Sequence, residues 1–165
     1  MDKAMTELVH DPNLDEIRRQ EQRLRFVRFG PDEAWSLGTR LRGMAMEVAA
    51  PVVIDVFCAG RTLFHNALEG SVPDNAEWVR RKRNVALRFW KSSYQIRLAL
   101  AELGVGFTER YGLPETDYAP HGGSVPIILA GTGCIGAVTV SGLPQKEDHA
   151  MVIAALEAEL GLGPI

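Results

Sequence analysis

The spacing of apolar and polar residues divides the chain into four or five predicted helices and about five predicted strands. Apolar residues three or four positions apart predict a helix that buries one side. Alternating apolar positions, or short apolar runs bounded by glycine or proline, predict strands. The predicted helices span about 12–22, 31–50, 74–103 and 144–160, and the predicted strands span about 24–29, 52–58, 61–65, 124–130 and 134–140.

The order of these elements predicts an α+β fold. The strands come in hairpin pairs with helices before and between them, which favours an antiparallel sheet covered by helices. A length of 165 residues is typical of one domain, so we predict a single domain over 1–165, with 1–22 as an N-terminal helical extension. Asp11 and Asp74 are the predicted N-caps of the first and third helices. Residues 105–122 lack periodicity and are predicted to form a long loop.

Composition narrows the class of protein. The chain is 46% hydrophobic and 24% charged, which is typical of a globular protein and excludes collagen and disordered chains. It has no apolar stretch of about 18 residues and its first twenty residues have no signal-peptide core, so we expect a cytoplasmic protein without a membrane partner. Cys58 and Cys134 are predicted to be buried free thiols, and no cysteine or histidine spacing indicates zinc.

A basic segment interrupts an otherwise acidic chain. Seven basic residues and no acidic residue lie between Trp78 and Arg97, although the net charge is -3. The segment fits a nucleic acid, a small anionic ligand bound by arginine, or a neighbouring subunit. The acidic remainder argues against nucleic acid. Lys82 and Ser93 share the apolar face of the predicted helix, so they either border a pocket or are satisfied beside the core.

Two further segments carry candidate chemistry. His121 precedes Gly122 and Gly123 at a boundary between loop and strand, where it is either an acid–base or metal-ligating group or a loop histidine bonded to backbone. Ser141 precedes the last helix, whose first amides are suited to an anion. Residues 131–136 match G-x-G-x-x-G, but a strand follows them instead of a helix. We therefore interpret this motif as a hairpin turn, not a dinucleotide site.

These segments resemble a known family. GGSVPI at 122–127, GAVTVSG at 136–142 and Asp148 are similar to the pattern GG-x-P-[IL]…G-A-[IV]-x-V-S-G…D of the GlcG/HbpS-like haem-degrading domain family. Similarity extends to 26–41 and to RKRN at 81–84, and the chain resembles the less characterised branch of unknown function. The resemblance implies a profilin-like α-β-α arrangement, a homo-oligomer, and haem binding with haem degradation in some members. The added N-terminal helix and the lack of a secretion signal depart from the better-studied members.

The first hypothesis is a homo-oligomeric protein that binds haem or a related small anionic ligand. Haem needs an axial ligand, an apolar slot and cations for its propionates. His121 or His65 is the candidate iron ligand, and the residues expected to border the ligand are Arg81, Lys82, Arg88, Ser93, Gly122, Gly123 and Ser141. Two alternatives stay open. One is a non-catalytic assembly protein whose basic helix contacts a neighbour, and the other is an enzyme that acts on a small carboxylate with His121 as base.

Overall fold

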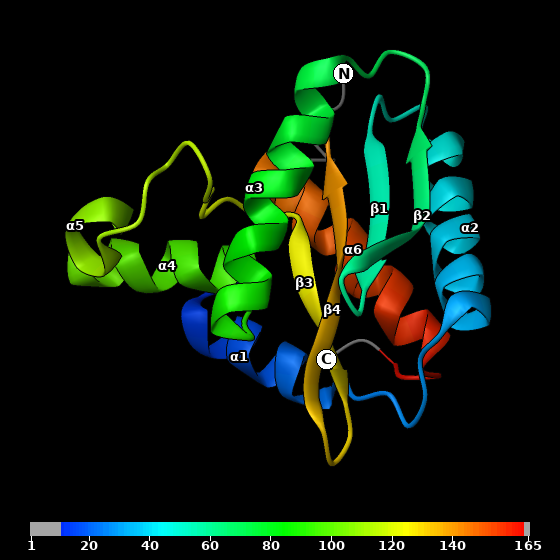
Figure 1. The fold of residues 1–165 in the computed structure, drawn as a ribbon, viewed down its shortest axis with the longest axis horizontal. Helices are drawn as coiled ribbons and strands as arrows, with labels where there is room; N and C mark the ends of the chain where they lie inside the picture. Colours follow the sequence, from blue (N-terminus) through cyan, green and yellow to red (C-terminus); the bar gives the residue numbers. More distant parts are fainter. Residues whose placement is uncertain (1–10, 164–165) are drawn as a thin grey trace, which may run out of the picture.

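The computed structural model describes residues 11–163, so residues 1–10 of the predicted N-terminal extension lie outside the described residues. Helices and strands follow one another along the chain in the order drawn in Figure 1. Their bounds are α1 (Leu14–Arg23), α2 (Pro31–Glu47), β1 (Val53–Cys58), β2 (Arg61–Ala67), α3 (Pro73–Phe89), α4 (Ser93–Leu103), α5 (Phe107–Tyr111), β3 (Ser124–Leu129), β4 (Gly133–Ser141) and α6 (Gln145–Glu159). None of the described helices is long and apolar enough to cross a membrane.

The sheet is antiparallel throughout, with the strand order β2-β1-β4-β3. Two hairpins, β1–β2 and β3–β4, meet through the pairing of β1 with β4 in the centre. The register places Asp55 opposite both His65 and Thr139, and Thr139 opposite Ser124. Because directly paired residues share a face of a sheet, these four polar side chains form one row across it.

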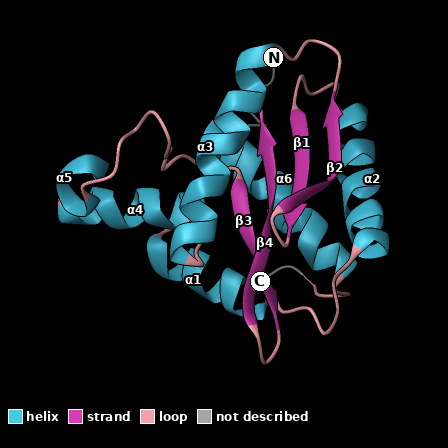
Figure 2. Ribbon diagram, viewed as in Figure 1, coloured by secondary structure: helices cyan, strands magenta, loops and turns pink. Residues whose placement is uncertain are grey.

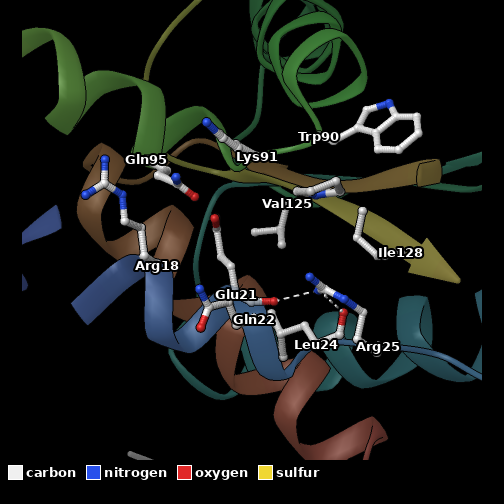
Figure 3. Close-up of a pocket in the computed structure, with 11 residues that line it drawn as sticks. Arg18, Glu21, Gln22, Leu24, Arg25, Trp90, Lys91, Gln95, Val125 and Ile128 are labelled. Atoms are coloured by element: carbon white, nitrogen blue, oxygen red, sulfur yellow. Dashed lines mark hydrogen bonds between the residues drawn. The ribbon is translucent and has the colours of Figure 1, made fainter. Parts of the chain in front are cut away.

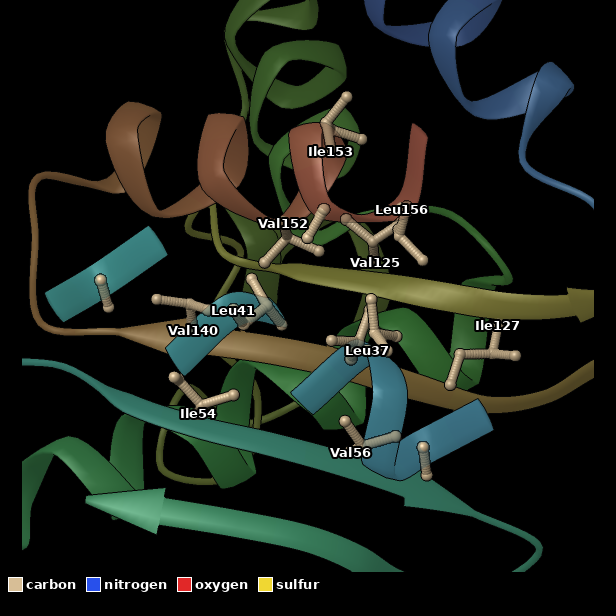
Figure 4. Close-up of a cluster of buried hydrophobic side chains, with 14 of the residues drawn as sticks. Leu37, Leu41, Ile54, Val56, Val125, Ile127, Val140, Val152, Ile153 and Leu156 are labelled. Carbon is tan, nitrogen blue, oxygen red and sulfur yellow. The ribbon is translucent and has the colours of Figure 1, made fainter. Parts of the chain in front are cut away.

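Helices cover both faces of the sheet, as Figure 2 shows. On one face, α2 and α6 bury the alternate residues of the strands that form the main core (Figure 4). There Leu37 and Leu41 of α2 and Leu156 of α6 meet Ile54 and Val140 of the sheet. On the other face, α3 packs across β4 and β3 beside the polar row. The α+β prediction is therefore confirmed, with helices on both sides of an antiparallel sheet.

The prediction of about five strands is not confirmed, because the sheet formed by the described residues has four strands. The segment predicted as a strand over 24–29 pairs at a single residue. Phe26 makes an isolated parallel bridge to Leu129, accepting from the Ala130 N–H and donating to the Ile128 carbonyl. Its alternation is real, since Leu24 and Phe26 are buried while Arg25 is exposed. Alternating apolar and polar residues show that one side of an extended segment is buried. They do not show that the segment pairs with a neighbouring strand.

The long helix predicted over 74–103 is broken in two. Trp90 adopts a left-handed conformation with φ 54, which ends α3. The Ser92 hydroxyl then accepts from the Gln95 N–H and starts α4. α4 and α5 project away from the sheet (Figure 1) and pack on the end of α3 around a second apolar cluster.

Smaller differences concern caps, loops and exposure. Asn13 caps α1 in place of Asp11, and the Asn75 side chain accepts from the Val72 N–H in place of a cap by Asp74. The predicted loop over 105–122 contains the short helix α5. Cys58 is buried as predicted, whereas Cys134 is only partly buried. Trp35 of α2 is 66% exposed although it is a large apolar residue.

Substitution of Gly136 tests how closely β1 and β4 approach each other. A Cβ atom at this buried position would collide with the Phe57 carbonyl oxygen of β1. We expect Gly136→Ala to lower the free energy of unfolding by about 1–3 kcal/mol, because the strands must separate to admit the methyl group. Urea denaturation followed by circular dichroism measures the change.

The control is Gly43→Ala on α2, where a Cβ meets nothing within 4 Å. Removing backbone freedom from the unfolded chain should raise the free energy of unfolding there, by about 0.4–1 kcal/mol. Equal effects at the two positions would contradict the close approach at Gly136.

Candidate functional site

A cavity of about 250 Å³ lies where α3, the loop before β3 and the start of α6 meet. We call it the Lys82 pocket. α3 contributes polar and aromatic side chains to it, and the turn that joins β4 to α6 contributes backbone and carboxylate groups. Its lining residues are Asn75, Trp78, Lys82, His121, Ser141, Gly142, Leu143, Gln145 and Asp148.

A buried ion pair forms the inner wall of this pocket. The Lys82 ammonium lies 2.9 Å from Asp148 Oδ2, and the two residues are 3% and 1% exposed. Asp148 also accepts from the Leu143 N–H at 3.0 Å and the Gly142 N–H at 3.3 Å. Burial lowers the pKa of Lys82 and raises the pKa of Asp148, and the contact between them opposes both shifts. The Lys82 side chain therefore does not extend past the core to water.

Glycines make room for this pair. Gly123 has φ +134, and a Cβ there would collide with the Val140 carbonyl oxygen and lie 2.9 Å from Lys82 Nζ. Gly142 has φ +149 and turns the chain from β4 so that its N–H meets Asp148. Gly123 thus makes room beside Lys82 and Asp148, whereas Gly142 lets the chain pass the Pro51 carbonyl and donate its N–H to Asp148.

His121 stands at the pocket with an unsatisfied ring nitrogen. Its Nδ1 atom is buried without a hydrogen-bond partner among the described residues, and its ring packs edge-on against Trp78 with centroids 5.2 Å apart. Burial lowers the pKa of His121, and the charges of Arg97, Lys82 and Arg81 lower it further. The imidazole is therefore neutral near pH 7, the state in which it accepts a proton or binds a metal.

The other predicted site residues do not all reach the pocket. Ser141 lines the pocket, and Arg81 lies at Trp78 with its guanidinium 4.1 Å from the ring centroid. Ser93 does not line it, because its buried hydroxyl bonds the backbone of Ser124. Arg88 is exposed two helical turns beyond Arg81, and its guanidinium lies 6.0 Å from the Tyr118 ring centroid.

His65 belongs to a separate cluster on the outer half of the sheet. Its Nδ1 lies 3.0 Å from Asp55 Oδ2, and the other Asp55 oxygen accepts from Arg83 at 3.0 Å. This cluster does not border the Lys82 pocket. Among the described residues, no group of three or more histidine, cysteine, aspartate or glutamate side chains is placed to hold a metal ion.

Sequence reasoning did not assign a site role to Asp148, Gln145 or Asn75. Asp148 lies in the first turn of α6 and within the family pattern, but an acid at that place is also typical of an ordinary helix start. Only the fold brings it to Lys82, 66 residues earlier in the chain. Asn75 has a structural role at the start of α3, because its side-chain oxygen accepts from the Val72 N–H.

Comparison with known proteins finds bacterial relatives that carry the name UPF0303 protein. It is 48% identical over 155 residues to a UPF0303 protein of Burkholderia ambifaria (strain MC40-6), covering 94% of this chain and 93% of the relative. It is 51% identical over 151 residues to a UPF0303 protein of Rhizobium meliloti (strain 1021), covering 92% of both.

Solved structures and a family model agree with this placement. The Ybr137w protein superposes with a TM-score of 0.83 at 33% identity, covering 90% of this chain and 89% of that one. HbpS covers 98% and 99% with a TM-score of 0.64 at 18% identity, and the PduOC:Heme complex covers 83% and 98% with a TM-score of 0.68 at 16% identity, so these two share the fold. The model described as haem degrading protein HbpS-like matches residues 29–157. The chain therefore belongs to the HbpS-like family of haem-degrading proteins.

Proposed function

We propose that the chain binds haem or a related anionic small molecule at the Lys82 pocket. The observation that carries the proposal is His121, a neutral imidazole beside the Lys82–Asp148 pair whose buried Nδ1 has no partner within residues 11–163. The family description, and a structural neighbour described as a haem complex, support the choice of haem.

The residues of the pocket fit haem in part. His121 would supply a nitrogen ligand for the iron, Trp78 an aromatic surface, and Arg81 a cation for a propionate. The cavity of about 250 Å³ is slightly smaller than the roughly 300–1,000 Å³ of common ligand sites. It therefore accommodates a carboxylate arm, while the macrocycle would lie outside it. When bound, haem supplies the iron chemistry that activates oxygen.

Lys82 is suited to receive such an arm. An ammonium group has three N–H donors. One meets Asp148 at 2.9 Å, and a second faces the Val140 carbonyl at 3.5 Å, which leaves a donor for a carboxylate in the pocket. Asp148 keeps Lys82 charged in a buried place. In this proposal Arg81 and Arg97 add positive charge around His121.

His65 is the second candidate ligand for iron. Metal-binding histidines commonly donate their other ring N–H to a carboxylate, and the His65–Asp55 contact provides that arrangement. The His65 side chain is 43% exposed, however, and it does not line the Lys82 pocket. His121 is therefore the preferred ligand.

The two alternative functions have weaker support. Assembly through the basic segment would use free charges, yet Arg80 pairs with Glu77 and Asp117, Lys82 with Asp148, and Arg83 with Asp55. Homo-oligomer formation itself stays a prediction. An enzyme acting on a small carboxylate would use this same pocket, with neutral His121 as the base.

Haem titration tests the ligand assignment. We expect hemin to give a saturable, shifted Soret band with the wild-type chain, and His121→Ala to abolish the shift because the proposed nitrogen ligand is lost. His65→Ala is the matched histidine control and should bind as the wild type does, with the fold of both variants checked by circular dichroism. Loss of binding in His65→Ala alone would move the site to β2, and an unsaturable wild-type response would overturn the haem proposal.

Denaturation tests whether the Lys82–Asp148 pair is as buried as the geometry shows. We expect Lys82→Met to lower the free energy of unfolding by about 3–5 kcal/mol, since it leaves the Asp148 carboxylate buried without its cation. Combining it with Asp148→Asn should recover part of the loss. Arg40→Met is the control, because it breaks a more exposed pair with Glu159 and should cost about 1 kcal/mol or less. A loss at Lys82 no larger than at Arg40 would contradict the buried pair.

A further inference from the structure

A second cavity, of about 190 Å³, lies between α1, the turn from α3 to α4, and β3 (Figure 3). We call it the α1 cavity. One wall comes from α1 and the two residues after it, which precede residue 29, where the match to the family model begins. The other wall comes from the shared domain. The lining residues are Arg18, Glu21, Gln22, Leu24, Arg25, Trp90, Lys91, Gln95, Val125, Pro126 and Ile128.

The charge around this cavity is positive. Three cations face it, Arg18, Arg25 and Lys91, against the single carboxyl group of Glu21. Arg25 donates to the backbone carbonyls of Glu21 and Leu24, and Arg18 bonds Asp15 on the outer side of α1. Lys91 makes no hydrogen bond or close ion pair with another described residue. It is therefore the cation available to a ligand.

The side-chain amide of Gln95 is a second polar group that lines the cavity, and it indicates a polar ligand. The residue is 6% exposed, and its side-chain amide has no hydrogen-bond partner among the described residues, although its backbone N–H bonds Ser92. Figure 3 shows this amide directed toward the space between α1 and β3. This amide lines the cavity, and an amide N–H without a protein partner there can donate to a bound polar group or water.

The remaining walls define the body of the ligand. Leu24, Val125 and Ile128 give the cavity an apolar lining. Trp90 stands at its edge, 57% exposed and held at φ 54, a conformation that bulky residues rarely adopt. Such strain is common where a side chain is positioned for a ligand. At roughly 30 Å³ for each water, the cavity has the volume of about six water molecules.

We propose that the α1 cavity binds a small carboxylate of about two to four carbon atoms. Its carboxylate group accepts from Lys91 and from the Gln95 amide, and its carbon chain lies against Val125 and Ile128. This site is separate from the Lys82 pocket, because the two share no lining residue.

Glu21 makes the affinity depend on pH. Burial raises its pKa to about 7, opposed by the hydrogen bond from the Ser92 N–H and by the charges of Lys91 and Arg25. The charged groups that line the cavity around Glu21 are Arg18 and Arg25 from the α1 side and Lys91 from the turn, and the lining residues of β3 are apolar. Below pH 7 Glu21 is mostly neutral, so an anion is repelled less at pH 6 than at pH 8.

Calorimetric titration of the full chain with propionate and pyruvate tests the proposal, with neutral propionamide as the control ligand. We expect saturable binding of at least one of the two acids, none of propionamide, and affinity several-fold lower at pH 8 than at pH 6. Lys91→Ala should weaken binding about tenfold, the effect of removing one charge-assisted hydrogen bond. Gln95→Leu should weaken it as well, while Arg110→Ala, which removes an exposed charge on α5, should not change it.

Three results would overturn the site. They are the absence of saturable heat with both acids, unchanged affinity in both Lys91→Ala and Gln95→Leu, and loss of acid binding in His121→Ala. The last result would place the acid in the Lys82 pocket. Lys91 is exposed, so its variant tests binding even where Gln95→Leu alters folding. Haem binding by His121 is measured separately, so either proposal can fail without the other.

Discussion

The buried contact between Lys82 and Asp148 is the constraint on which the described site depends. It joins the middle of α3 to the first turn of α6 across the end of the sheet, so it fixes two helices that cover opposite faces. Gly123 is required because the chain there passes close to Lys82 and Asp148, and Gly142 because the chain must pass the Pro51 carbonyl to bring its N–H to Asp148. A buried pair of this kind adds little net stability, yet it tolerates few alternative arrangements of its neighbours. The pocket and His121 take their positions from it.

Much of the fold could be predicted from local patterns. The two hairpins, the helices that flank them and the apolar face of α6 follow from periodicity, since buried positions such as Val152, Ile153 and Leu156 recur at helical spacing. The break in the long helix was missed because the apolar spacing continues across Trp90, although Ser92 carries the side chain of an N-cap. The extra strand was predicted because Leu24 and Phe26 are buried on one side, which a segment lying beside a sheet edge also achieves.

The candidate site was predictable only by residue type. Lys82, His121 and Ser141 attracted notice as polar groups at unusual places, and they do share one pocket. Ser93 stood on the same helical face as Lys82 in the sequence, but the break at Trp90 carries it to the backbone of Ser124. Asp148 could not be assigned to Lys82 from spacing, because a contact between distant segments depends on the strand order. The α1 cavity likewise depends on the packing of α1 against α4 and on the bridge from Phe26 to β3, and no local sequence pattern predicts either contact.

The break at Trp90 also separates two parts of the molecule that differ in the free energy needed to open them locally. Beyond it, α4 and α5 pack on the end of α3 through the small cluster of Val85, Ile96, Leu100 and Phe107, apart from the main core. Regions with fewer buried apolar contacts open locally at a lower free energy than the central strands. This lobe can therefore fluctuate while the sheet and the Lys82 pocket stay closed. A ligand in the α1 cavity would touch Gln95 at the base of α4 and so would reduce this motion at its hinge.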